Sequence, residues 1–283
     1  MTDIISLIKE KSGDLSKNHV RLADYIAANH SKAAYMTAAK LGAAVGVSES
    51  TVVRFAGEIG FDGYPEFQES LQSYVKSNLT SCQRIELTNT LITRDTLKSV
   101  LTQDIHRIRA TIDEADEGDF ETAVDFILNA KKIYIFGAMS SAILAKFLGG
   151  YLGLVFDNVV LVEPQGEGGV RQQMFHISAE DMLFVASFPR YSRTAVSAAR
   201  FAKERGAKVV ALTDSETSPI AALANGLLTA KSDMVGYADS LVAPLSVVNA
   251  LIVAVGMRRR HEIETALAKL ESLWGETDVY EKS

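Results

Sequence analysis

The chain has 283 residues, of which 47% are hydrophobic and 23% are charged, so it can bury a sizeable core and about two domains are expected. Its net charge of −6 argues against a chain coated all over in nucleic acid, although it leaves room for a local DNA-reading patch. The single cysteine, Cys82, excludes an intramolecular disulfide and suits the reducing environment of the cytoplasm.

Residues 1–77 are predicted to form a small all-helical domain. Apolar residues recur there at helical spacing in several short runs, separated by glycine-containing breaks at Gly46 and at residues 60–63. The first residues already have the pattern of an amphipathic helix, which does not fit a secretion signal. Residues 78–94 are polar and lack strong periodicity, so we expect a linker there.

Within this domain, residues 38–45 and 48–59 have the pattern of a helix-turn-helix. Gly46 would form the turn, and the Ser48 hydroxyl would cap the second helix. The apolar positions of that helix face the core, which leaves a small polar face that suits the DNA major groove. The candidate DNA contacts are Lys40, Ser48, Glu49, Ser50, Thr51 and Arg54. A helical hairpin with a merely solvated polar face fits the same pattern, and acidic and basic residues are nearly balanced over residues 1–77.

Residues 95–283 are predicted to form an α/β domain. Helical spacing covers residues 95–113 and 119–129, and short apolar runs then alternate with helices. The expected strands are residues 132–136, 159–162, 182–186, 209–212 and 226–229. This alternation predicts a doubly wound, five-stranded parallel sheet covered on both faces, so the whole chain has an α plus α/β fold. The long apolar run at 241–257 contains Pro244 and Asn249, and we expect a buried helix packed on the sheet rather than a membrane span.

A polar loop follows the strand at 182–186 and precedes a helix predicted at 195–205. In an open α/β sheet, the carboxyl ends of the strands form the ligand-binding edge. Hydroxyl and guanidinium groups at a helix N-terminus favour an anion. The candidate ligands in this loop are Ser187, Arg190, Tyr191, Ser192, Arg193 and Thr194. Each arginine, taken singly, also fits a surface or subunit-interface charge.

A second candidate loop follows the first strand. It contains Gly137, Ser140 and Ser141 and leads into a helix expected at 142–152. Together with the first loop it would bind one phosphorylated or polyhydroxylated ligand, although serines that only cap helices fit as well. Glu163 ends the second strand beside a loop predicted at 164–169, and it is a candidate for hydrogen bonds to sugar hydroxyls.

The sequence gives a weak case for catalysis. No convincing pair of acid and base accompanies the two loops, no His/Cys/Asp spacing suggests a metal, and the glycine fingerprint of a dinucleotide site is missing. We therefore expect a protein that is not an enzyme and has no cofactor or metal.

The chain resembles the RpiR/MurR family of bacterial transcriptional regulators over almost its whole length. The residues that carry the N-terminal resemblance are Val47, Ser48, Thr51–Phe55, Gly60, Phe61, Gly63, Tyr64, Glu66 and Phe67, and residues 202–225 carry it in a sugar-isomerase (SIS) domain. The resemblance implies domains at 1–77 and 95–283, operator DNA as a partner, a sugar phosphate or related effector, and a homodimer or homotetramer.

Two loops depart from the family pattern. The phosphate loop usually reads Ser-x-Ser-Gly-x-Thr, but residues 187–194 are longer, lack the glycine and add arginines. Met139 replaces the second glycine of the first loop. The resemblance carries over Ser141, Ser187, Ser192 and Thr194 as hydroxyl ligands and leaves open a sugar acid as effector. A sugar-phosphate isomerase with a helical appendage, and a sensor without DNA contact, are the alternatives.

Overall fold

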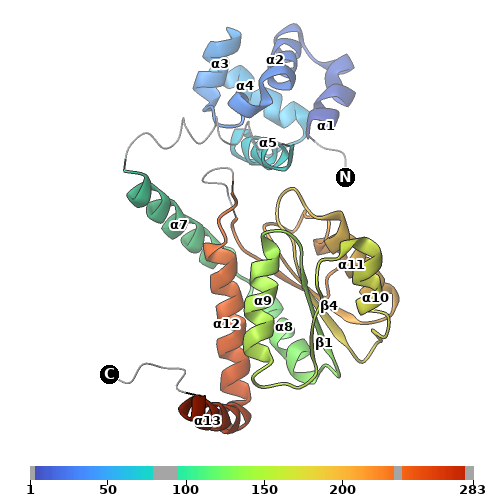
Figure 1. The fold of residues 1–283 in the computed structure, drawn as a ribbon. Helices are drawn as coiled ribbons and strands as arrows, with labels where there is room; N and C mark the ends of the chain where they lie inside the picture. The colour runs from blue at the N-terminus through green and yellow to red at the C-terminus, as the bar shows by residue number, and fades with distance from the viewer. Residues whose placement is uncertain (1–3, 79–94, 233–237, 278–283) are drawn as a thin grey trace. The chain divides into compact units, whose positions relative to one another are not determined.

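The computed structural model describes residues 4–78, 95–232 and 238–277, and the chain divides into two compact units, Met1–Leu87 and Thr88–Ser283 (Figure 1). Nearly all of the predicted linker, from residue 79 to residue 94, lies outside the described residues.

The first unit is helical throughout its described part, as predicted. Its elements are α1 (Ile4–Lys11), a 3-10 turn (Ser12–Asp14), α2 (Lys17–Ala33), α3 (Ala38–Val45), α4 (Glu49–Ile59) and α5 (Tyr64–Asn78). Hydroxyls of Ser16, Thr37 and Ser48 cap the N-termini of α2, α3 and α4. The core is built around two fully buried aromatic rings, Phe55 and Phe67, which meet edge to face at 5.7 Å.

The second unit alternates strands and helices. Its elements are α7 (Thr96–Asp113), α8 (Glu117–Asn129), β1 (Ile133–Gly137), α9 (Ser141–Leu152), β2 (Val159–Leu161), α10 (Gly166–Gln173), β3 (Met182–Ala186), α11 (Arg193–Glu204), β4 (Lys208–Thr213), a 3-10 turn (Ala221–Leu223), β5 (Gly226–Thr229), α12 (Val242–Arg258) and α13 (Arg260–Thr277).

The five strands form one sheet in the order β2-β1-β3-β4-β5, and every neighbouring pair is parallel. All five residues of β1 and of β3 are buried, as expected for strands covered on both faces. The predicted doubly wound, five-stranded parallel sheet is therefore confirmed.

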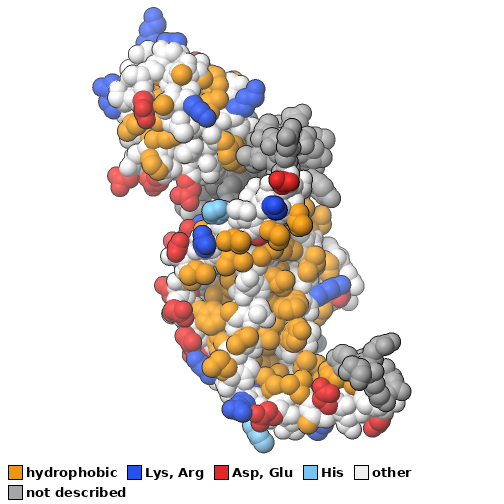
Figure 2. All heavy atoms as spheres, turned by 90° about the vertical axis from the view of Figure 1, so that its left-hand side faces the viewer, with side chains coloured by type: hydrophobic (Ala, Val, Ile, Leu, Met, Phe, Trp, Pro, Cys, Tyr) orange, Lys and Arg blue, Asp and Glu red, His pale blue; other side chains and the backbone are white. Residues whose placement is uncertain are grey.

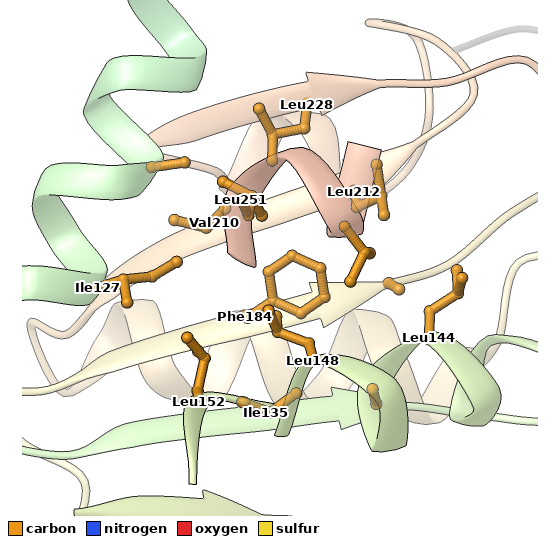
Figure 3. Packing of buried hydrophobic residues seen from close by; sticks show 14 of the residues in the cluster. Ile127, Ile135, Leu144, Leu148, Leu152, Phe184, Val210, Leu212, Leu228 and Leu251 are labelled. Atoms are coloured by element: carbon orange, nitrogen blue, oxygen red, sulfur yellow. The ribbon is translucent and has the colours of Figure 1, made fainter. Parts of the chain in front are cut away.

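Helices cover the two faces of the sheet in separate layers. Side chains from α8, α9 and α12 pack on one face, where Phe184 of β3 lies at the centre of the cluster (Figure 3). Buried residues of α10 and α11, among them Val170 and Ala199, pack on the other face. Since α9 and α10 lie on opposite faces, the chain reverses its winding direction between β1 and β3.

Two sequence-based expectations need correction. Residues 166–169, predicted as loop, form the first turn of α10. The helix at 242–258 is buried on one side only: Val248, Leu251 and Val255 are at most 1% exposed, whereas Val253 and Met257 are 52% and 77% exposed.

Within residues 4–78, 95–232 and 238–277, no single helix has both the length and the apolar composition of a membrane span. Only α12 and α13 taken together meet both conditions, with a bend of 101° between them.

Candidate DNA-reading helix and effector site

The geometry of α3 and α4 is that of a helix-turn-helix. Gly46 ends α3 in the left-handed conformation, at φ 75°, and the Ser48 hydroxyl accepts a hydrogen bond from the Thr51 amide at 3.2 Å. A Cβ atom at Gly42 would lie 2.8 Å from the Val47 carbonyl oxygen, so only glycine allows the turn to pack this closely on α3. This glycine inside a helix was a signal that the sequence reasoning missed.

The exposed face of α4 begins with Glu49, Ser50 and Arg54. Lys40 of α3 is also exposed. Thr51 is not: it is 9% exposed, and its hydroxyl is 2.8 Å from that of Ser48. The expectation that Thr51 belongs to the outer face is therefore wrong, because the threonine closes the cap instead.

Two basic side chains of this unit donate hydrogen bonds to backbone carbonyls of the same unit. The Arg21 guanidinium donates to the Val45 carbonyl at the end of α3. The Lys11 ammonium donates to the Glu58 and Ile59 carbonyls at the end of α4, at 3.1 and 2.8 Å. Both side chains bond to backbone carbonyls at the C-terminus of a helix, where the carbonyls have no partner within the helix. Arg54, whose Nε donates to the Ser50 carbonyl at 3.3 Å, stays on the exposed face near the cap.

In the second unit, the two candidate loops leave the sheet side by side. Gly137 at the end of β1 pairs with Ala186 at the end of β3, so the segments that follow them start at neighbouring positions. This is also where the winding direction reverses, the usual position of a ligand crevice in such sheets. A Cβ at Gly137 would lie 2.2 Å from the Ser141 carbonyl oxygen, so no other residue fits that turn.

Two of the four residues whose hydroxyls were carried over from the family pattern are buried. Ser141 and Ser187 are 4% and 2% exposed. The Ser187 hydroxyl accepts from the Ser192 amide at 3.2 Å, and the Ser192 hydroxyl accepts from the Ala195 amide at 3.3 Å to cap α11. Ser187 and Ser192 therefore shape the loop, and Ser140, Arg190 and Arg193 are the exposed side chains among the predicted ligands of the two loops.

Tyr191 is fixed toward the next strand of the sheet. Its hydroxyl donates to Asp214 Oδ1 at 2.8 Å, and Asp214 directly follows β4. Burial, and then the Asp214 carboxylate, hold the pKa of Tyr191 far above its usual value, so the phenol stays a neutral donor. Sequence reasoning missed Asp214, although its place at the end of a strand on the ligand edge could have revealed it.

Both loops contain a strained residue. Met139 and Arg190 have φ values of 55° and 68°, a region that costs an ordinary residue roughly 1–2 kcal/mol. Met139 stands where the family pattern has glycine, the residue that adopts this left-handed conformation without strain. Within the described residues, the only other non-glycine with positive φ is Asp95. Such strain often marks ligand-binding loops.

Glu163 lies beyond the end of β2, on the other side of β1 from the Ser187 loop. Its amide and carbonyl both bond to the Gln173 side chain, at 2.8 and 3.0 Å, and its own side chain is exposed. Glu167 does not flank a loop: it lies in α10 and pairs with Arg171 at 3.1 Å and Ser197 at 2.7 Å.

Within residues 4–78, 95–232 and 238–277, no group of three or more His, Cys, Asp or Glu side chains could hold a metal ion.

Two family models match the chain, and together they cover most of it. The helix-turn-helix domain of the rpiR family matches residues 2–78, and the SIS domain matches residues 126–254. The chain belongs to the RpiR family of transcriptional regulators. It therefore combines a DNA-binding domain with a sugar-phosphate-sensing domain, which confirms the class of protein predicted from the sequence.

Named relatives agree with this assignment. The HTH-type transcriptional regulator HexR of Pseudomonas aeruginosa is 26% identical over 286 residues, which covers 96% of this chain and 95% of the relative. The sugar isomerase domain of an RpiR transcription factor from Sphaerobacter thermophilus is 28% identical, with a TM-score of 0.60 over 63% of this chain and 99% of that one.

A solved structure that matches nearly the whole chain shares the fold. The structure of the Vibrio vulnificus NanR protein complexed with ManNAc-6P is 19% identical, with a TM-score of 0.60 over 98% of this chain and 100% of that one.

Proposed function

We propose that this RpiR-family regulator binds operator DNA through α4 as a homodimer or homotetramer in the cytoplasm. We further propose that its SIS domain binds a phosphorylated sugar or sugar acid between the loops after β1 and β3. The observation that carries the effector site is the convergence of these loops, each with a left-handed non-glycine residue, at the point where the sheet reverses its winding.

The DNA contacts are proposed for the first turns of α4. Ser50 and Arg54 are exposed on one face of that helix, and Lys40 is exposed on α3. An arginine can donate two hydrogen bonds to a guanine or pair with a phosphate. Glu49 would repel phosphates, but its carboxylate can accept a hydrogen bond from a cytosine amino group. Ser48 acts indirectly, because its hydroxyl is engaged in the cap.

The effector contacts are proposed for the N-terminus of α11 and the exposed side chains beside it. The amides at the start of a helix favour an anion, and the guanidinium of Arg193 or Arg190 can pair with a phosphate or carboxylate in two places. Ser140 and Thr194 would bond ligand hydroxyls. The ManNAc-6P bound to NanR supports a phosphorylated sugar, and the two added arginines leave room for a sugar acid.

We propose that the site binds its ligand without turning it over. The predicted ligands are hydroxyls and guanidinium groups, and the Asp214 carboxylate at the same edge is held by Tyr191. Isomerisation of a sugar phosphate needs a base within reach of the substrate carbon and an acid at its carbonyl. Incubation with aldose and ketose phosphates, followed by chromatography, tests this point: formation of the isomeric sugar would show an enzyme.

The main test is fluorescence anisotropy of the full chain with labelled DNA from its own upstream region. Sequence-specific binding that weakens as salt rises is expected, because each phosphate contact releases counterions. Arg54→Ala should lower affinity at least tenfold, whereas Arg200→Ala, an exposed arginine of α11, should leave it unchanged. Equal binding of specific and scrambled DNA would contradict the proposal.

The effector is tested in the same titration. Hexose 6-phosphates, N-acetylmannosamine 6-phosphate and gluconate 6-phosphate serve as probes, read by thermal shift and by the change in DNA affinity. Arg193→Gln should abolish the shift that an active probe produces. If no probe shifts the wild-type melting temperature, the proposed class of effector is wrong.

A further inference from the structure

One apolar side chain stands alone on the outer surface of the helix that we propose reads DNA. In the second unit, apolar side chains gather over one face, as Figure 2 shows. Within residues 4–78, by contrast, the large hydrophobic side chains that are exposed are Tyr35 and Val53, at 38% and 42%. Tyr35 follows α2, whereas Val53 lies in the middle of α4. Val53 therefore needs an explanation of its own.

The exposed surface of α4 consists of two rows of residues, each with a spacing of four. The rows are Ser50, Arg54 and Glu58 on one side, and Glu49, Val53 and Gly57 on the other. Residues four apart are neighbours on a helix surface. Val53 thus lies between a carboxylate one turn before it and a glycine one turn after it, beside the row that contains the arginine.

The stability of α4 explains neither the valine nor the glycine. At an exposed helix position valine loses rotamer freedom, and glycine loses more backbone entropy than any other residue, so alanine would favour the helix at both. A Cβ at Gly57 would meet nothing within 4 Å, so the fold does not require glycine there. Gly42 differs, because its Cβ would lie 2.8 Å from the Val47 carbonyl oxygen. The reason for Val53 and Gly57 therefore lies in what α4 contacts.

The DNA major groove offers one apolar group to a helix that enters it. That group is the C5 methyl of thymine, and side chains with methyl groups recognise it by apolar contact. Val53 presents two methyl groups at the centre of its row. Gly57, one turn further along the helix, leaves room for DNA to approach the backbone of α4 closely.

The residues around Val53 favour the edge of a base pair over an apolar protein surface. Protein partners are marked by contiguous apolar patches, whereas Val53 is surrounded on α4 by Glu49, Ser50, Arg54 and Gly57. In the major groove the thymine methyl likewise lies among hydrogen-bonding atoms of the bases. A single apolar side chain among polar ones matches that arrangement.

We propose that Val53 recognises the C5 methyl group of a thymine in each operator half-site, and that Gly57 lets the DNA approach α4 closely enough for this contact. The inference deepens the proposed function and rests on it, because α4 must lie in the major groove. Glu49 then faces a base pair one or two steps away, since side chains four apart on a helix start roughly 5–6 Å from each other and base pairs stack at about 3.4 Å.

Replacement of thymine by deoxyuridine tests the proposal, because it removes the methyl group and nothing else. The shortest upstream fragment that the full chain binds specifically is prepared with each thymine replaced in turn, and affinity is measured by fluorescence anisotropy. At the recognised position, deoxyuridine should lower the affinity about fourfold, the effect of one buried methyl group. Val53→Ala should lower the affinity for the thymine operator at least as much, and should bind the thymine and deoxyuridine operators equally.

Two further variants separate this contact from other effects. Lys40→Ala, at an exposed position of α3, should lower the affinity for both operators and leave their ratio as in the wild type. Gly57→Ala should raise the melting temperature of the first unit, because alanine favours the helix. It should nevertheless bind both operators severalfold more weakly, since the added methyl group holds the DNA away. Circular dichroism checks that Val53→Ala is folded.

Several outcomes would overturn the proposal. If specific DNA binds more tightly than scrambled DNA but every deoxyuridine operator binds like the original, no thymine methyl is read. Sensitivity to deoxyuridine that persists in Val53→Ala would show that another side chain reads the methyl group. Unchanged affinity in Gly57→Ala would show that glycine has no part in the approach. Equal binding of specific and scrambled DNA would instead contradict the proposed function itself, so the two failures are distinguished.

Discussion

Ser240 donates a 2.7 Å hydrogen bond from its hydroxyl to Asp104 Oδ1, and so joins the residues just before α12 to the middle of α7, 136 positions earlier in the chain. The same carboxylate oxygen accepts from Arg107 at 3.1 Å, and both charged residues are largely buried. This cluster ties the start of α12 to the middle of α7.

Asp104→Ala is expected to destabilise the second unit by about 3 kcal/mol, because it removes the carboxylate that accepts from both the buried Arg107 guanidinium and Ser240. Ser240→Ala should cost about 1 kcal/mol, the usual contribution of one hydrogen bond. The fluorescence of Trp274, the only tryptophan, reports urea unfolding of this unit. Asp113→Ala, at an exposed position of α7, is the control and should change stability by less than about 0.5 kcal/mol. Equal effects of Asp104→Ala and Asp113→Ala would contradict this prediction.

Gly137→Ala is expected to distort the turn after β1, since the added Cβ would meet the Ser141 carbonyl at 2.2 Å. Forced overpacking of this kind typically costs about 1–3 kcal/mol, and the displaced turn should also weaken effector binding. Gly150→Ala in α9 is the matched control, because nothing lies within 4 Å of the added Cβ. It should stabilise the helix by roughly 0.5–1 kcal/mol. Thermal unfolding with and without an active sugar phosphate measures both effects, and a neutral Gly137→Ala would show that the turn can relax.

Two substitutions of Ser48 distinguish the effect of the cap on the stability of α4 from the contact of α4 with DNA. Ser48→Ala should lower the stability of the first unit by about 1 kcal/mol, because the Thr51 amide loses the hydroxyl as one of its two acceptors. Ser48→Asp keeps an acceptor at the cap and should retain stability, but it adds a negative charge beside the proposed DNA contacts. Its DNA affinity should therefore fall more than that of Ser48→Ala, measured by anisotropy at low salt. Stronger DNA binding by Ser48→Asp than by Ser48→Ala would argue against α4 as the DNA-reading helix.

The regular elements were predictable because their patterns are local. The strands at 182–186 and 226–229 and the helix at 38–45 have the predicted bounds. Apolar runs mark all three, and Gly226 and Gly46 mark one end of the second strand and of the helix. The all-helical first unit and the parallel sheet follow from the same periodicities.

What the sequence did not reveal depends on tertiary contacts. Three glycines made residues 164–169 look like a loop, but buried Val170 and the bonds between Gln173 and Glu163 hold residues 166–173 as a helix, so packing overrides propensity. In the candidate sites, Thr51 turned inward to Ser48, and Asp214 was found only through its bond to Tyr191. A mostly apolar stretch such as α12 does not show in its sequence which of its sides packs on the sheet.

Tyr64 should make the first unit sensitive to alkaline pH. Burial raises the pKa of its phenol from 10.0 to about 12, and its hydroxyl donates to the Met36 carbonyl at 2.8 Å. Below pH 10 both the folded and the unfolded chain keep this phenol neutral. Between pH 10 and about 12 the unfolded chain ionises first, so the free energy of unfolding should fall by up to about 1.4 kcal/mol per pH unit.

Tyr64→Phe should remove this part of the pH dependence and keep the fold at pH 7, because Gln68 still donates to the Met36 carbonyl at 2.6 Å. Absorbance at 295 nm of the full chain measures the ionisation directly, and the late-titrating signal should be smaller in the variant by one tyrosine. Circular dichroism across the same pH range shows whether the helical signal falls later in the variant than in the wild type. If Tyr64→Phe instead lowers the signal that titrates near pH 10 and leaves the late-titrating signal unchanged, the phenol does not stay neutral in the folded unit.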